Sequence, residues 1–88
     1  MKPTIKAAIY NPDPSVDRIW ARARVLKALQ WRFPEAEVRV EYAQDDFYDP
    51  CEAVVIALNF GRPALNEAVE RLAEHLAESA VAEKEAFR

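Results

Sequence analysis

The segment EVRVEY, from Glu37 to Tyr42, alternates charged and apolar side chains without a break, and it limits the possible folds more than any other feature. Successive side chains of a β-strand point to opposite faces, so Val38, Val40 and Tyr42 share one face and the charged residues share the other. Sheets covered by helices on both sides carry apolar side chains on both faces, which this strand does not. The chain is therefore predicted to form a sheet that keeps one face in water.

Two other segments have strand patterns. Residues 4–10 (TIKAAIY) place apolar side chains on one face and a lysine on the other, which is again an alternating pattern. Residues 53–60 (AVVIALNF) carry no charge on either face. An apolar run of this length is typical of a buried strand, so this third strand is predicted to lie in the centre of the sheet.

Two helical segments complete the pattern. The first is predicted over residues 14–32, because a proline suits the first position of a helix. The second begins near Pro63 and reaches close to the last residue of the sequence. Its apolar line fades after Leu76, so residues 79–88 are predicted to form a helical tail extending beyond the core of a single α/β domain, residues 1–88.

The order strand, helix, strand, strand, helix favours an α/β (α+β) domain with two layers. We predict a β-α-β-β-α sandwich with a three-stranded sheet in the order 1-3-2, strand 3 antiparallel between its neighbours, and both helices on one face. This arrangement resembles a ferredoxin-like fold that lacks its last strand. It leaves strand 1 as an open edge, which invites pairing with another chain. The alternative is a small Rossmann-like unit with three layers and parallel strands.

Charge is distributed unevenly along the chain. The net charge is −3, yet residues 1–44 carry eight Lys and Arg against five Asp and Glu, whereas residues 45–88 carry four against ten. Such polarity disfavours general nucleic-acid binding and suits contact between complementary protein surfaces. No apolar run approaches the ~20 residues that cross a bilayer, so no membrane association is predicted. A single cysteine, Cys51, favours a reducing, cytoplasmic location.

No segment carries the signature of a cofactor or metal site. One glycine cannot supply a glycine-rich phosphate loop, so no cofactor is predicted. The acidic loop between the second and third strands lacks the spacing of an EF-hand, and no metal is predicted there. Because this loop also holds Phe47 and Tyr48, it is a candidate contact for a basic partner, including the basic helix of a second copy.

The segment RIWARARVLKALQWRF, from Arg18 to Phe33, holds both tryptophans and five basic residues on the first predicted helix. At 100° per residue, the expected core stripe of this helix comprises Ile19, Ala23, Leu26, Leu29 and Phe33. A second line of side chains, spaced i, i+4, i+7 and i+11, comprises Trp20, Arg24, Lys27 and Trp31. This second line can pack on the other helix, stack on nucleic-acid bases or bind a protein. Because Trp and Arg dominate the energetics of protein interfaces, we predict protein binding.

Two short segments resemble parts of the nucleoside deoxyribosyltransferase-like family. They are a first strand that ends in Tyr10, and CEAVVIALNFGRPALNEA, with Glu67 early in the following helix. The resemblance implies an alternative ligand-binding site for a nucleoside or nucleotide, formed by Tyr10, Asn59 and Glu67, in a degenerate enzyme domain. Asn59 stands where the family has an acidic residue. This alternative requires strands 1 and 3 to be adjacent and parallel, so that the three side chains converge.

The sequence therefore predicts a small non-enzymatic module that binds protein, in a regulatory role. Its expected partner is another protein or a second copy of the chain, as a homodimer, and neither nucleic acid nor a membrane is expected. The alternative, a small-molecule-binding domain, differs in needing a pocket at the ends of strands 1 and 3.

Overall fold

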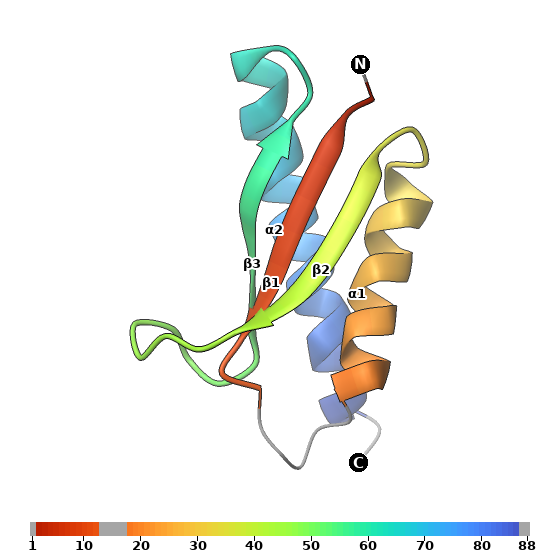
Figure 1. Cartoon of the computed structure of the whole chain (residues 1–88). Helices are drawn as coiled ribbons and strands as arrows, with labels where there is room; N and C mark the ends of the chain where they lie inside the picture. Colours follow the sequence, from red (N-terminus) through yellow and green to blue (C-terminus); the bar gives the residue numbers. More distant parts are fainter. Residues whose placement is uncertain (1, 13–17, 87–88) are drawn as a thin grey trace.

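The computed structural model describes residues 2–12 and 18–86, which form a small domain of mixed α and β structure (Figure 1). Its elements are β1 (Thr4–Tyr10), α1 (Arg18–Arg32), β2 (Glu37–Ala43), β3 (Glu52–Asn59) and α2 (Pro63–Ala86). The order of strands and helices is the one the sequence patterns predict. The predicted start of the first helix, at residue 14, lies outside the described residues.

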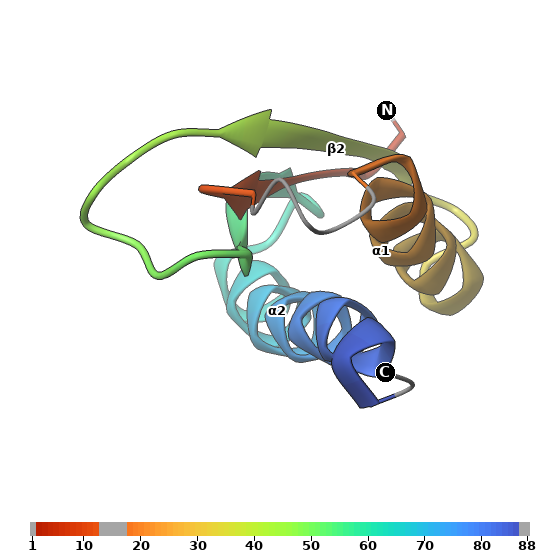
Figure 2. The same ribbon diagram turned by 90° about the horizontal axis from the view of Figure 1, so that it is seen from below.

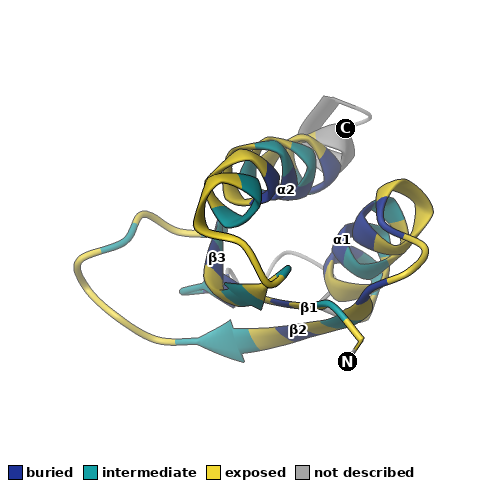
Figure 3. Cartoon of the chain, turned by 90° about the horizontal axis from the view of Figure 1, so that it is seen from above, coloured by how far each residue is buried: buried dark blue, intermediate teal, exposed yellow. Residues whose placement is uncertain are grey.

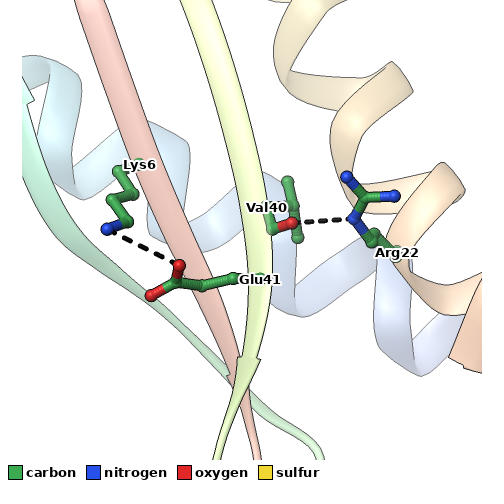
Figure 4. Close-up of polar contacts among 4 residues, drawn as sticks. All are labelled: Lys6, Arg22, Val40 and Glu41. Carbon is green, nitrogen blue, oxygen red and sulfur yellow. Dashed lines mark hydrogen bonds and ion pairs between the residues drawn. The ribbon is translucent and has the colours of Figure 1, made fainter.

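The sheet has the order β2-β1-β3, so β1 is the central strand. The predicted order 1-3-2, with β3 in the centre and β1 at an open edge, is wrong. Ala7, Ala8 and Ile9 of β1 are all buried, as a central strand requires. The prediction was misled by Lys6, whose charge lies on the exposed sheet face and is met there by Glu41 of β2, with 3.5 Å between Nζ and Oε2 (Figure 4).

The strand directions settle the alternative topology. β1 is parallel to β2 and antiparallel to β3, so the Rossmann-like unit with parallel strands is wrong, while the predicted antiparallel direction of β3 is confirmed. Both helices lie on the same side of the sheet (Figures 2 and 3). Because β1 and β2 are direct neighbours, no strand separates them as it would in a ferredoxin-like fold.

The core lies between the sheet and the two helices, and α2 contributes to it mainly through small side chains. Ala73, Ala77 and Ala80 are buried, and Val81 packs against the same cluster. The predicted departure of the helix from the core at Ser79 is therefore corrected to a point beyond Val81. The prediction followed the leucines and missed alanines that continue the buried stripe at helical spacing. Side chains from residue 83 onward lie outside the described part.

The two edges of the sheet are β2 and β3, and they differ in protection. Along β2, α1 covers the edge, and Arg22 donates a hydrogen bond from Nε to the Val40 carbonyl oxygen at 2.8 Å (Figure 4). In β3, the pairing with β1 shifts at Ile56, which is left as an extra residue in a β-bulge. A bulge twists an edge strand and hinders pairing with another strand, so neither edge is a regular template for strand addition.

Candidate protein-binding surfaces

The face that α1 turns toward the core differs from the predicted one. Ala21, Val25 and Leu29 are buried at i, i+4 and i+8, whereas Ile19 is 83% exposed. The predicted stripe is correct for Leu29 and Phe33 and wrong for Ile19 and Ala23. The buried face of α1 is therefore centred on Ala21, Val25 and Leu29, and Ile19 lies off it because positions 19 and 21 are 200° apart around the helix at 100° per residue.

The predicted ridge of Trp20, Arg24, Lys27 and Trp31 divides into two parts. Trp20 and Arg24 are half-buried and engaged in contacts, and Trp20 packs against the core cluster. Lys27 is exposed, and Trp31 is 84% exposed at the last turn of the helix. The structure therefore leaves the C-terminal half of the ridge open to solvent and uses Trp20 for packing.

The exposed stripe of α1, hereafter the α1 surface, comprises Ile19, Ala23, Lys27, Gln30 and Trp31. Its two large apolar side chains, Ile19 and Trp31, are about 18 Å apart along the helix at 1.5 Å per residue. The helix carries five basic residues and no acidic one. The exposed indole is the feature of this face that suits a protein contact, because Trp is enriched in protein interfaces.

A second surface is the loop between β2 and β3, which extends away from the body of the molecule (Figure 1). The Asn11 side chain holds this loop in three hydrogen bonds. Its Nδ2 donates to the carbonyl oxygens of Asp45, at 2.7 Å, and of Tyr48, at 2.8 Å, and its Oδ1 accepts from the Asp45 amide at 2.9 Å. Asn11 has φ 48°, in the left-handed region that asparagine tolerates better than most residues. One side chain thus fixes the loop to the end of β1.

Aromatic packing adds to this anchoring. The Tyr48 ring stacks on Tyr10 with 3.9 Å between ring centroids, and Phe47 meets Tyr48 edge to face. Phe47 itself is 86% exposed at the tip of the loop, beside Asp46 and Asp45. The loop is therefore an anchored structure that presents one phenyl ring among carboxylates. The sequence indicated its composition but gave no sign that Asn11 would hold it.

The Tyr10 hydroxyl reports on this packing. Partial burial, followed by the neighbouring Tyr48 and Asp45, raises the pKa of Tyr10 above its ordinary value of 10.0. Each of these causes disfavours the tyrosinate anion, which an acidic, partly desolvated loop cannot stabilise. Tyr10 is consequently neutral at physiological pH and acts as a stacking platform for Tyr48.

The alternative site predicted from Tyr10, Asn59 and Glu67 is not assembled. In the antiparallel pairing, Tyr10 lies opposite Glu52 and Asn59 lies opposite Thr4, at the other end of β1. Six residues of strand separate these ends by roughly 20 Å. Glu67 is exposed on α2 and pairs with Arg71, with 2.8 Å between Oε1 and Nη2. The three side chains do not line a common pocket.

Within the described part of the chain, no three His, Cys, Asp or Glu side chains gather in a way that could hold a metal ion. His75 is exposed on α2, and Cys51 is half-buried at φ 61°, where its amide donates to the Tyr10 carbonyl oxygen at 2.8 Å. No helix among the described residues is long and apolar enough to cross a membrane.

Comparison with known proteins does not place the chain in a family. No protein-family model matches it, and neither the curated proteins nor the solved structures include a match. The α1 surface and the β2–β3 loop are therefore the features of the molecule that bear on its function.

Proposed function

We propose that this chain is a small protein-binding module, regulatory rather than catalytic, that acts in the cytoplasm through the α1 surface. The observation that carries the proposal is the 84% exposure of Trp31 on a helix with five basic and no acidic residues. An indole left in water forgoes the stabilisation that burial gives a large apolar side chain, about 1.5–3 kcal/mol for groups of this kind. A partner that covers Trp31 recovers that free energy.

The electrostatics of α1 indicate which partner fits. Lys27 lies one helical turn before Trp31, so a cation and an indole are neighbours on the same line of the helix. Arg22, three residues after Ile19, is itself held by the Val40 carbonyl, which fixes a positive charge close to Ile19 at the other end of the α1 surface from Trp31. A partner surface with carboxylates next to an apolar side chain is complementary to this arrangement.

The test is binding by a variant in which only Trp31 changes. Trp31→Ala should keep the far-UV circular dichroism spectrum and unfolding midpoint of the parent, because its side chain is exposed, yet lose binding to the partner by about 30-fold, as interface hot spots do. His75→Ala, an exposed position on α2 outside the α1 surface, is the control and should bind as the parent does. Trp20 is unsuited to this test, since it packs against the core. Equal binding by Trp31→Ala and the parent would reject the α1 surface.

A further inference from the structure

Exposed large apolar side chains occur at few places in the described part of the chain. They are Ile19, Trp31, Phe47 and Ile56. Ile56 belongs to the bulge of β3, and the others occupy the α1 surface and the tip of the β2–β3 loop. The molecule therefore has two projecting apolar surfaces, each built around an aromatic ring that is more than four-fifths exposed.

These two surfaces carry opposite charge. The α1 helix has five basic residues and no acidic one. Residues 44–52 have four acidic residues, Asp45, Asp46, Asp49 and Glu52, and no basic one. Opposite charge on two apolar patches favours their association and suppresses contact between like patches. Complementarity of this kind, within a single sequence, points to a second copy as the partner.

We propose that the β2–β3 loop of one copy docks on the α1 surface of a second copy, with Phe47 against Trp31 and Asp46 against Lys27. This inference rests on the proposed function, because it assigns a partner to the same α1 surface. Lys27 and Trp31 are i, i+4 neighbours with about 5–6 Å between Cβ atoms, a spacing that the consecutive residues Asp46 and Phe47 can match.

The anchoring of the loop supports this assignment. Asn11 and the stack of Tyr48 on Tyr10 hold the backbone on both sides of Phe47 in place before any partner arrives. A preorganised loop loses less conformational entropy on docking than a mobile one, so more of the contact energy appears as affinity. The Phe47 amide donates to Asp45 Oδ1 at 3.0 Å and its ring makes an edge contact with Tyr48, which leaves most of the ring for a partner.

The acidic side chains of α2 are a less suitable partner for α1. Glu67 is already paired with Arg71, and the exposed Glu70 lines a pocket together with Ile56, which is 40% exposed against 86% for Phe47. Contact with this region would neutralise charge but offer Trp31 a smaller apolar counterpart than Phe47. Glu70 therefore supplies a control with the same charge as Asp46.

The positions of the two surfaces determine the type of assembly. The loop and α1 lie on opposite sides of the molecule in all three ribbon views (Figures 1, 2 and 3). A chain therefore cannot place its loop on its own α1 surface. The contact between two copies is heterologous, which means that one copy contributes its loop and the other copy its α1 surface. Such head-to-tail contact adds copies in succession and ends in a closed ring or an open filament, instead of stopping at a two-fold dimer.

The test uses two variants that each lose one half of the contact. The loop variant combines Asp46→Lys with Phe47→Ala, and the helix variant combines Lys27→Glu with Trp31→Ala. All four positions are exposed, and circular dichroism confirms the fold of each protein before use. Light scattering then measures the mass of the parent, of each variant alone and of their equimolar mixture. The parent should grow beyond a dimer with rising concentration, each variant should remain monomeric, and the mixture should form a 1:1 dimer and stop.

A charge exchange makes the test specific. Lys27→Glu alone should weaken self-association at least about 10-fold, Asp46→Lys in the same chain should restore it, and Glu70→Lys should leave it unchanged. A parent that stays monomeric at its highest soluble concentration, or a mixture that forms no dimer, overturns the proposal. If α1 binds a different protein in the Trp31→Ala comparison while the mixture stays monomeric, the second-copy assignment fails and the proposed function stands.

Discussion

Replacing Asn11 tests the account at the residue that connects the fold to the proposed surface. Asn11→Gly removes the three side-chain hydrogen bonds to the β2–β3 loop and keeps a residue that accepts φ 48° without steric cost. Asn11→Ala removes the same bonds and also places a Cβ in the left-handed region. The pair of substitutions therefore separates the contribution of the bonds from that of the backbone conformation.

The expected magnitude follows from the geometry of the bonds. All three are short, at 2.7–2.9 Å, but two of them are exposed to solvent, so each is placed at the lower end of the usual net value of about 0.5–1.5 kcal/mol. Asn11→Gly should lower the free energy of unfolding by about 1.5–3 kcal/mol, including the greater flexibility of glycine in the unfolded chain. Asn11→Ala should cost up to about 1 kcal/mol more, because of its positive φ.

Urea unfolding followed by circular dichroism measures both effects. With a slope of about 1–3 kcal/mol/M, a loss of about 2 kcal/mol moves the urea midpoint of a small domain by about 0.7–2 M. Gln44→Ala, in the same loop and exposed, is the control and should stay within about 0.5 kcal/mol of the parent. If both Asn11 variants also stay within that range, the side chain does not anchor the loop and the preorganisation argument fails.

Further predictions concern the core and the pH dependence. Leu29→Ala should lower the free energy of unfolding by about 2–5 kcal/mol, because Leu29 is fully buried. Ile19→Ala should change it by no more than about 0.5 kcal/mol, because Ile19 is exposed. Equal losses of stability in thermal unfolding would contradict the assignment of the buried face of α1. Folding raises the pKa of Tyr10, so the neutral hydroxyl stabilises the folded state. This contribution to the free energy of unfolding is complete below pH 10.0 and is lost as the pH rises through the higher pKa of the folded state. In an absorbance titration of the tyrosines, Tyr10→Phe should remove a component whose pKa lies above 10.0. If the component that it removes has the ordinary pKa of tyrosine, the stacking of Tyr10 with Tyr48 is contradicted.

Local patterns were sufficient to predict the elements but not the sheet order. The alternation of Glu37–Tyr42 correctly indicated one wet face, because side-chain direction in a strand is a local property. Strand order depends on which strands pair, and Lys6 made β1 resemble an edge. A lysine is tolerated on the exposed face of a central strand when a neighbouring strand supplies an acidic partner, as Glu41 of β2 does for Lys6. The pairing of β1 with β2 that brings these two residues together cannot be predicted from either segment alone.

The candidate surfaces show the same limit. The prediction correctly placed Trp31 off the core stripe, but it wrongly placed Ile19 in the core. Helical periodicity gives the angles between side chains around the helix, but it does not say which of these angles faces the core. The acidic and aromatic composition of the β2–β3 loop was visible in the sequence. Its anchoring was not, since Asn11 is 34 residues from Asp45 and only the β1–β2 pairing brings them together.

The central claim, that a second copy covers Trp31, is tested most directly by the fluorescence of that residue. In a Trp20→Phe background, Trp31 is the only tryptophan, so its emission and its quenching by acrylamide report on one ring. As protein concentration rises, emission should shift to shorter wavelength and quenching should fall, and both changes should disappear when Phe47→Ala is added. An indole that stays fully quenchable at every concentration, or one protected equally without the Phe47 ring, would contradict the account.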